Sequence, residues 1–255
     1  MELFDSHAHY NDEKFDVDKD NLLKEIYNEG ITKLVCAGYN TESSRAAVDL
    51  AEKYDFIYAT VGISPNDVED YNNENIRIIS ELATNKKVVA IGEIGLDYYW
   101  NKENKELQQE VFKRQIEIAN LVNKPIVIHT REAVSDTIDI LKNKVNVNKK
   151  GIFHCCPLNP ELIKEGIKLG FYISFSGNVT FKNAKAERAV KEVPIEKILI
   201  ETDSPYLSPE PMRGKRNDSR NVKFVAEKIA EILEEDMDFI AKTTYSNAKK
   251  IFEID

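Results

Sequence analysis

The 255-residue sequence has few cysteines and no long apolar run, and each shortage excludes a class of protein. Its three cysteines are an odd number, and Cys36, Cys155 and Cys156 lack the spacing of a metal knuckle, so we expect reduced thiols. No apolar segment approaches the roughly 18 residues of a membrane span. The first five residues have neither the basic region nor the apolar stretch of a signal peptide. These absences predict a cytoplasmic protein that does not bind membranes.

Positive charge is also in short supply. The chain has 35 Lys and Arg residues against 44 Asp and Glu residues, which gives a net charge of −9. This balance argues against an extended basic surface that binds a nucleic-acid duplex. It is compatible with a small site that binds one phosphate or one strand end. Apolar residues make up 42% and charged residues 31%, a globular composition that excludes disordered, collagen-like and coiled-coil proteins.

Eight short apolar runs recur at intervals of about thirty residues, the length of one βαβ unit. They are rich in β-branched residues and nearly continuous in hydrophobicity, as expected for strands buried on both faces. The runs lie at 3–5, 33–37, 56–61, 88–91, 125–128, 151–153, 171–174 and 197–200. Amphipathic helical patterns fill the gaps at 17–29, 42–54, 73–82, 105–121, 134–141, 161–169, 184–191, 222–233 and 238–252.

This alternation predicts an α/β fold, a (β/α)8 TIM-like barrel that forms a single domain over residues 1–255. No linker rich in Pro or Ser and no low-complexity tract divides the chain. A doubly wound open sheet is the structural alternative. That fold binds nucleotides through a Gly-rich first turn between strand and helix, and the first turn here contains no glycine.

Polar residues gather where the predicted strands end. All four histidines of the chain follow strands, and carboxylates follow the fourth and eighth strands. His7 and His9 are two residues apart in an extended segment, so both can reach one ion. The carboxyl ends of barrel strands form the active site of this fold. Although a single strand-end histidine is commonly a hydrogen-bonded loop residue, four of them with carboxylates predict a divalent-metal site.

The number of potential ligands exceeds the roughly four of one closed zinc site, so we expect two ions about 3.5–4 Å apart. Glu93 is the candidate bridge between them. Two such ions lower the pKa of bound water toward 7, which predicts hydrolysis of an ester, amide or phosphodiester. Zn, Mn, Co and Mg remain open as the metal, although imidazole ligands suit the first three better.

Several blocks of the sequence resemble the TatD family of metal-dependent hydrolases, within the amidohydrolase superfamily. They cover essentially the whole chain in order: DSHAH at 5–9, GEIGLDYY at 92–99, IHTR at 128–131, FHC at 153–155, ETDSPYL at 201–207, RGKRN at 213–217 and NAKKIF at 247–252. The resemblance implies a TIM-like barrel with one to three divalent metals. It implies as ligands His7, His9, Glu93, His129, His154 and Asp203.

The resemblance also implies deoxyribonuclease activity, usually as an exonuclease acting from the 3′ end of single-stranded DNA. Some members have other hydrolase roles, including removal of D-amino acids from tRNA. Asp203 is the candidate general base, with a helix-capping role as its structural alternative. Glu201 is expected to support a ligand rather than bind metal, and Asp5 either orients an imidazole from behind or ends its strand.

The sequence departs from the family after the third predicted strand. Where the family usually has Gly-x-His-Pro-His, this chain has Ser64 and Asn66, which can donate hydrogen bonds to substrate but cannot become cationic. A second departure is Cys156-Pro157-Leu158, where the family often continues Phe-Ser-Gly. The cationic candidates for phosphate contacts are Arg131, Arg213 and Arg216, with Lys215 and Arg220 in the same basic loop.

We therefore predict a cytoplasmic two-metal phosphodiesterase that acts on DNA ends, with Asp203 and Glu93 as catalytic residues. An aromatic run, Tyr98-Tyr99-Trp100, can stack on a base or pack as a cap on the barrel. The alternative function is hydrolysis of a small ester, lactone or amide on the same scaffold, as a deacylase or lactonase. A metal-binding module without catalysis is a third possibility. No obligate protein partner is evident.

Overall fold

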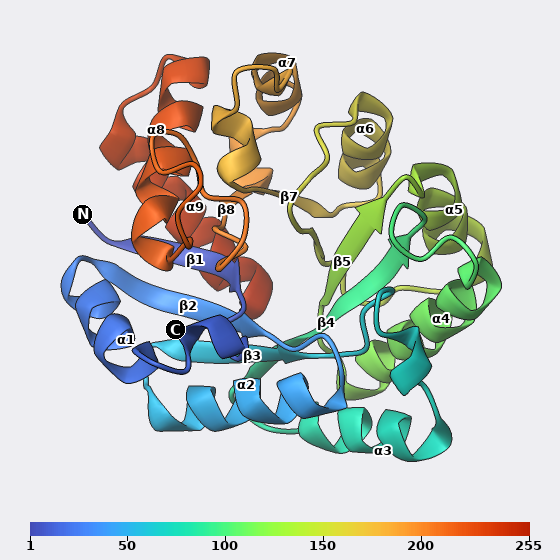
Figure 1. The fold of residues 1–255 in the computed structure, drawn as a ribbon. Coiled ribbons are helices and arrows are strands. Elements are labelled where there is room, and N and C mark those ends of the chain that lie inside the picture. Colours follow the sequence, from blue (N-terminus) through green and yellow to red (C-terminus); the bar gives the residue numbers. More distant parts are fainter.

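The computed structural model describes residues 1–255 as a ring of eight parallel strands surrounded by helices (Figure 1). The strands are β1 (Leu3–Ala8), β2 (Ile31–Ala37), β3 (Ile57–Val61), β4 (Val88–Asp97), β5 (Ile126–Arg131), β6 (Ile152–Phe153), β7 (Tyr172–Phe175) and β8 (Ile198–Ile200). The α-helices are α1 (Lys19–Asn28), α2 (Thr41–Lys53), α3 (Asn73–Leu82), α4 (Lys105–Val122), α5 (Val134–Asp139), α6 (Pro160–Lys168), α7 (Ala186–Lys191), α8 (Val222–Leu233) and α9 (Met237–Phe252).

Each strand pairs in parallel with the next in sequence, and a bridge between Ala8 of β1 and Ser204, which follows β8, nearly closes the ring. Closure uses backbone hydrogen bonds between the end of β1 and the segment that follows β8. The His9 amide donates to the Ser204 carbonyl at 2.7 Å, and the Asp203 amide donates to the His7 carbonyl at 2.9 Å. The predicted (β/α)8 barrel is therefore confirmed. The same closing bonds bring the β1 histidines beside Asp203.

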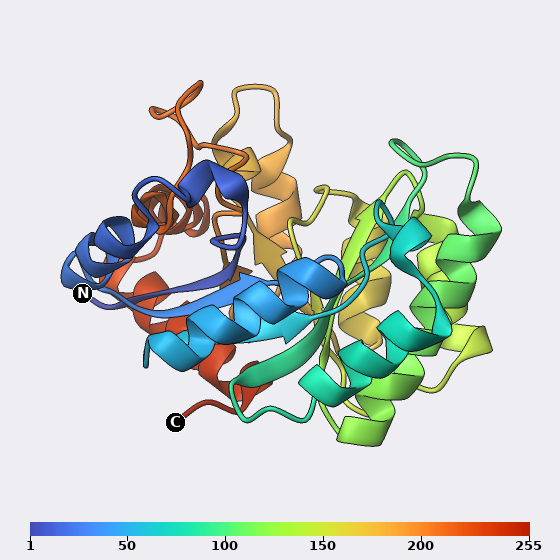
Figure 2. The ribbon, with the colours of Figure 1, turned by 60° about the horizontal axis from the view of Figure 1, so that its bottom comes forward.

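One end of the barrel interior is filled with apolar side chains. Phe4, Val35, Val89, Val127, Ile152, Tyr172 and Leu199, each from a different strand, form one cluster with residues of α9 and the C-terminus. Phe4 stacks on Phe252 of α9 with ring centroids 6.0 Å apart. In Figure 2 α9 lies against the lower side of the sheet, close to the C-terminus. This packing leaves the opposite, carboxyl end of the strands for polar side chains.

Strand β4 is longer than the apolar run at 88–91 predicts, because it continues through Gly92 and Glu93 to Asp97. Gly95 pairs with His129 of β5, with a φ of +138°. A Cβ at Gly95 would lie 2.0 Å from the His129 carbonyl oxygen, so only glycine permits this close approach. The extension carries Glu93 and Asp97 on the strand itself. None of the helices is long and apolar enough to span a bilayer.

Candidate metal centre

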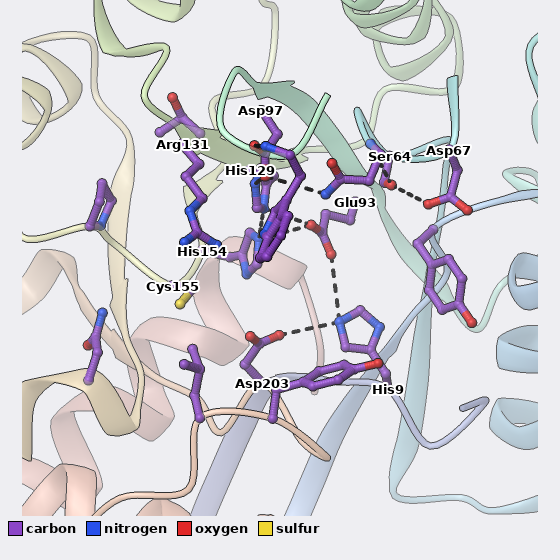
Figure 3. Close-up of a pocket in the computed structure, with 18 residues that line it drawn as sticks. His9, Ser64, Asp67, Glu93, Asp97, His129, Arg131, His154, Cys155 and Asp203 are labelled. Carbon is purple, nitrogen blue, oxygen red and sulfur yellow. Dashed lines mark hydrogen bonds and ion pairs between the residues drawn. The ribbon is translucent and has the colours of Figure 1, made fainter. Parts of the chain in front are cut away.

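Six side chains predicted as ligands converge at the carboxyl end of the barrel. They come from five strands or the residues directly after them: His7 and His9 from β1, Glu93 from β4, His129 from β5, His154 after β6 and Asp203 after β8. Figure 3 shows five of these residues around the floor of one cavity. Their role as ligands stays a prediction, but the structure brings all six together.

Glu93 lies between two groups of donors and presents one carboxylate oxygen to each. Its Oε2 lies 3.4 Å from His7 Nε2 and 3.6 Å from His9 Nε2. Its Oε1 lies 2.9 Å from His129 Nδ1 and 3.3 Å from His154 Nε2. Asp203 completes the first group, with Oδ1 at 3.3 Å from His9 Nε2. A carboxylate in this position can bind one ion through each oxygen.

In each group of donors, two imidazole nitrogens face each other at a spacing that suits one shared cation. His7 Nε2 and His9 Nε2 are 3.2 Å apart, and His129 Nδ1 and His154 Nε2 are 3.3 Å apart. Donor atoms held at about 2.0–2.2 Å from one tetrahedral ion lie roughly 3.3–3.6 Å from one another. The donor set, four imidazoles and two carboxylates, also suits a borderline divalent metal. The residues therefore fit the predicted ions.

The charge states of the two buried carboxylates favour cation binding, whereas His154 must lose a proton before it can bind a metal. Burial opposes ionisation of Glu93, but the charge of His154 and the hydrogen bond from His129 hold its pKa well below the usual range. Burial likewise opposes ionisation of Asp203, and His9 outweighs it to lower the carboxyl pKa. For His154, burial favours the neutral ring, yet Glu93 and Glu201 raise its pKa well above normal. Both carboxylates are thus anionic at neutral pH, the form that ligates metals.

A buried hydrogen-bond network holds β1 and the β8 segment in place. Asp5 Oδ1 accepts from the amide of Thr202 at 2.9 Å, and Oδ2 accepts from the hydroxyls of Thr202 at 2.6 Å and Ser219 at 2.5 Å. The Asp5 carboxylate contacts the His7 amide at 3.4 Å rather than an imidazole. Neither role expected for Asp5 is observed: its carboxylate contacts no imidazole, and it lies within β1 rather than at the end of the strand. Asp203 follows Thr202 with a φ of +56°, a conformation that Asp tolerates better than most residues.

Two buried glutamines of α4 fix the ends of neighbouring strands. Gln108 Oε1 accepts from the Asp97 amide at 2.8 Å, and its Nε2 donates to the Asp97 carbonyl at 3.1 Å. Seven residues further on, Gln115 makes the same pair of bonds to Ile63, at 2.7 and 2.9 Å. These clamps hold the backbone at the end of β4 and just before Ser64. The signal in the sequence was two polar residues on the apolar face of α4.

A cavity of about 700 Å³ opens above the six predicted ligands. Ser64, Asn66 and Arg131 line it, and their role as substrate contacts stays a prediction. Ser64 Oγ donates to Asp67 Oδ2 at 2.6 Å, and Asn66 Nδ2 lies 3.4 Å from Asp97 Oδ2. That side of the cavity is therefore neutral to acidic.

The predicted basic loop does not reach the cavity. Arg213 lies over the Phe181 ring at 4.0 Å and donates to the Ser208 carbonyl at 3.1 Å. Arg216 forms a two-point ion pair with Asp18 at 2.6 and 2.9 Å. Neither residue is among those that line the cavity, so the structure separates them from the other predicted substrate contacts.

Asp97 and Glu201 each lie beside the ring nitrogen of a histidine that faces away from Glu93. Asp97 Oδ2 lies 2.9 Å from His129 Nε2, a contact that the sequence reasoning missed although Asp97 is part of the GLDYY block. Glu201 is fully buried, accepts from the Cys155 amide at 2.6 Å and lies 3.4 Å from His154 Nδ1. Glu201 therefore has the supporting position expected for it.

A nearly closed eight-stranded barrel with imidazoles and carboxylates at the carboxyl ends of its strands defines a class, the metal-dependent hydrolases with TIM-type barrels. A family model described as "TatD related DNase" matches residues 4–253, and the chain belongs to that family. An uncharacterized metal-dependent hydrolase of Bacillus subtilis, YabD, is 46% identical over 253 residues, which cover 99% of each chain. The uncharacterized metal-dependent hydrolase YcfH of Escherichia coli K12 is 37% identical over 260 residues, covering 100% of this chain and 97% of YcfH.

Solved structures share the fold. The crystal structure of YJJV, a TatD homologue from Escherichia coli K12, superposes with a TM-score of 0.93 at 24% identity, covering 99% of this chain and 98% of that one. A TatD family hydrolase from Entamoeba histolytica gives a TM-score of 0.86 at 21% identity, covering 98% of both chains.

Proposed function

We propose that this protein is a two-metal phosphodiesterase that cleaves DNA at strand ends, in the manner of a 3′-to-5′ exonuclease. The observation that carries the proposal is the position of Glu93, whose two oxygens face two separate groups of imidazoles. Zn, Mn, Co and Mg are the candidate ions, and the imidazole-rich donor set favours the first three. When bound, two such ions supply a nucleophile at neutral pH and stabilise charge on the reacting oxygens.

The residues of the chain have distinct roles in this proposal. His7, His9 and Asp203 would hold one ion, His129 and His154 would hold the other, and the two oxygens of Glu93 face both groups. The Asp203 side chain is 15% exposed and faces the cavity, so its carboxylate oxygen can accept the proton of the attacking water.

Arg131 supplies the cationic contact to phosphate in this proposal. Asn66 can donate a hydrogen bond to substrate, whereas the Ser64 hydroxyl already donates to Asp67, and neither residue can carry charge. The cavity therefore has one arginine on one side and Asp67 with Ser64 on the other. Three free cysteines support a reducing compartment, and a cytoplasmic location is part of the proposal.

The test is an assay on single-stranded DNA carrying a label at its 5′ end, with added Mn²⁺ or Mg²⁺. We expect products that shorten stepwise from the 3′ end and that disappear with a chelator. Glu93→Gln and Asp203→Asn should abolish cleavage while circular dichroism shows the fold intact. Glu187→Gln, which neutralises an exposed carboxylate on α7, is the matched control. Full activity in Glu93→Gln or Asp203→Asn would exclude this mechanism.

A second candidate function is hydrolysis of a small ester, lactone or amide. The acidic Ser64 and Asp67 side of the cavity and the net charge of −9 favour it. A side-by-side assay of oligonucleotide, lactone and acyl-ester substrates decides between the two. Turnover of esters without any cleavage of DNA would replace the first proposal with the second.

A further inference from the structure

Trp100 is a large apolar side chain left in solvent at the rim of the cavity. It is 68% exposed, lines the cavity and is the only tryptophan of the chain. Tyr99 beside it is 42% exposed, with its ring centroid 4.7 Å from that of Trp100. Exposed aromatic rings at the mouth of a polar cavity are a recognition surface rather than a core.

Arg131 lies against both rings and has no acidic partner. Its guanidinium carbon is 4.0 Å from the Tyr99 centroid and 5.4 Å from the Trp100 centroid. Arg77, Arg114, Arg188, Arg216 and Arg220 all pair with carboxylates, whereas no carboxylate lies within ion-pair distance of Arg131. An unpaired guanidinium beside aromatic rings can bind phosphate and stack at the same time.

The backbone under these rings is held firmly although the side chains are open. Asp97 Oδ1 accepts from the amides of Tyr99 and Trp100, both at 2.9 Å. Gln108 Nε2 donates to the carbonyl of Asn101 at 2.6 Å.

Tyr98, the residue before these two rings, behaves differently. It is 7% exposed, and its hydroxyl donates to Asp136 at 2.7 Å. Tyr98 is thus part of the packing and Tyr99 carries Arg131, while the Trp100 ring is free to stack on a ligand.

We propose that Trp100 and Arg131 form a subsite for one unpaired nucleobase, in which the base stacks on Trp100 and Arg131 contacts the phosphate next to it. Tyr99 supports the subsite, because its ring meets Trp100 edge-on, at an interplanar angle of 87°, and carries the Arg131 guanidinium. This inference rests on the proposed function and names its substrate more closely. Both faces of a base inside a duplex are covered by neighbouring bases, so only a single-stranded or frayed end can present a free face. Stacking accepts any of the four bases, so the subsite selects unpaired ends without selecting sequence.

Because Trp100 is the sole tryptophan, its fluorescence reports occupancy of the subsite without any turnover. The probes are two phosphorothioate-linked tetranucleotides of equal charge, oligothymidylate and its abasic analogue, titrated into the Zn²⁺-loaded protein. We expect saturable quenching by oligothymidylate and none by the abasic strand. Equal quenching by both strands, or quenching by neither, overturns the subsite. Quenching by oligothymidylate together with no cleavage of unmodified single-stranded DNA would instead retain the subsite and remove the proposed exonuclease function, so the two failures are distinguishable.

Variants give the second test, by steady-state kinetics on cleavable strands. Trp100→Ala should raise KM for single-stranded DNA roughly 5- to 150-fold with kcat nearly unchanged, and should leave abasic substrate unaffected. Trp100→Phe should restore most of the affinity. Phe239→Ala, which removes another exposed aromatic ring on α9, is the matched control. An equal loss on base-containing and abasic strands would mean that Trp100 only supports the fold, and would overturn the proposal.

Discussion

The Asp97 carboxylate lies 2.9 Å from His129 Nε2 through one oxygen, and through the other it accepts the amide hydrogens of Tyr99 and Trp100. One side chain therefore joins a predicted metal ligand to the proposed stacking subsite. Burial raises the pKa of Asp97, but the hydrogen bond from His129 and the two amides outweigh it and keep the carboxyl pKa low. An anionic Asp97 fixes His129 with Nε2 as the donor, which leaves Nδ1 free to face Glu93.

Asp97→Asn should weaken metal binding without abolishing it. The amide is a poorer acceptor for His129 Nε2–H, so the ring loses both basicity and orientation. We expect metal affinity at the His129 and His154 side to fall by about 10- to 100-fold, measured by equilibrium dialysis with metal analysis. Asp139→Asn, an exposed carboxylate on α5, should leave affinity unchanged. Unchanged metal content in Asp97→Asn would contradict the supporting role.

The six ligands could be predicted from the sequence because each lies at or near the end of a regular apolar run. In a parallel barrel all those ends share one rim, so position along the chain fixed their position in space. The helices α3 and α8 likewise begin and end where the apolar periodicity predicts, at Asn73–Leu82 and Val222–Leu233. Periodic patterns carry that information because one face of each element is buried.

Other parts of the site depended on contacts that no local pattern encodes. The Arg213–Arg216 loop carries charge, yet its path depends on Phe181 and Asp18, which are remote in sequence. Asp97 looked like part of a turn, because Gly92 and Gly95 interrupt the apolar pattern of β4. The glycines instead allow the strand to pass close to β5 and to continue.

Gly95→Ala should destabilise the barrel strongly at the site. Its Cβ would sit 2.0 Å from the His129 carbonyl oxygen, and the φ of +138° is unfavourable for alanine. We expect the free energy of unfolding, measured by urea denaturation, to fall by roughly 3 kcal/mol or more, the upper end of what ordinary substitutions cost. Gly214→Ala is the control, because it has a φ of +81° but nothing within 4 Å, and should cost only about 1 kcal/mol. Similar losses in both variants would show that β4 and β5 can separate.

Asp5→Asn should change how stability depends on pH. Burial raises the pKa of the Asp5 carboxyl to about 7, although the hydroxyls of Ser219 and Thr202 lower it. The folded chain therefore binds more protons than the unfolded chain between pH 3.8 and about 7, so this contribution to stability is present at low pH and is lost as pH rises through 7. Asn resembles the protonated form, and the two hydroxyls that donate to Oδ2 can turn to accept from its amide.

We expect the stability advantage of Asp5→Asn over the unmodified chain to grow from pH 5 to about pH 7, by at most about 1.4 kcal/mol per pH unit, and to level off above that. Urea denaturation in the presence of a chelator, at intervals of half a pH unit, measures this difference. If the two free-energy curves run parallel across that range, Asp5 is already ionised in the folded protein at pH 5.

Metal removal should lower the thermal stability of the protein. Without ions, the buried imidazole nitrogens of His7 and His9 face each other at 3.2 Å with no shared cation. An ion present at 100 times its dissociation constant stabilises the folded state by about 2.7 kcal/mol, which corresponds to roughly 5–10 °C for a domain of this size. Calorimetry with and without a chelator should show this shift. Glu93→Gln should shrink the shift because it removes the carboxylate that faces both groups, while Glu187→Gln should retain it in full. A melting temperature that does not respond to chelation would mean that the six side chains hold no ion in solution.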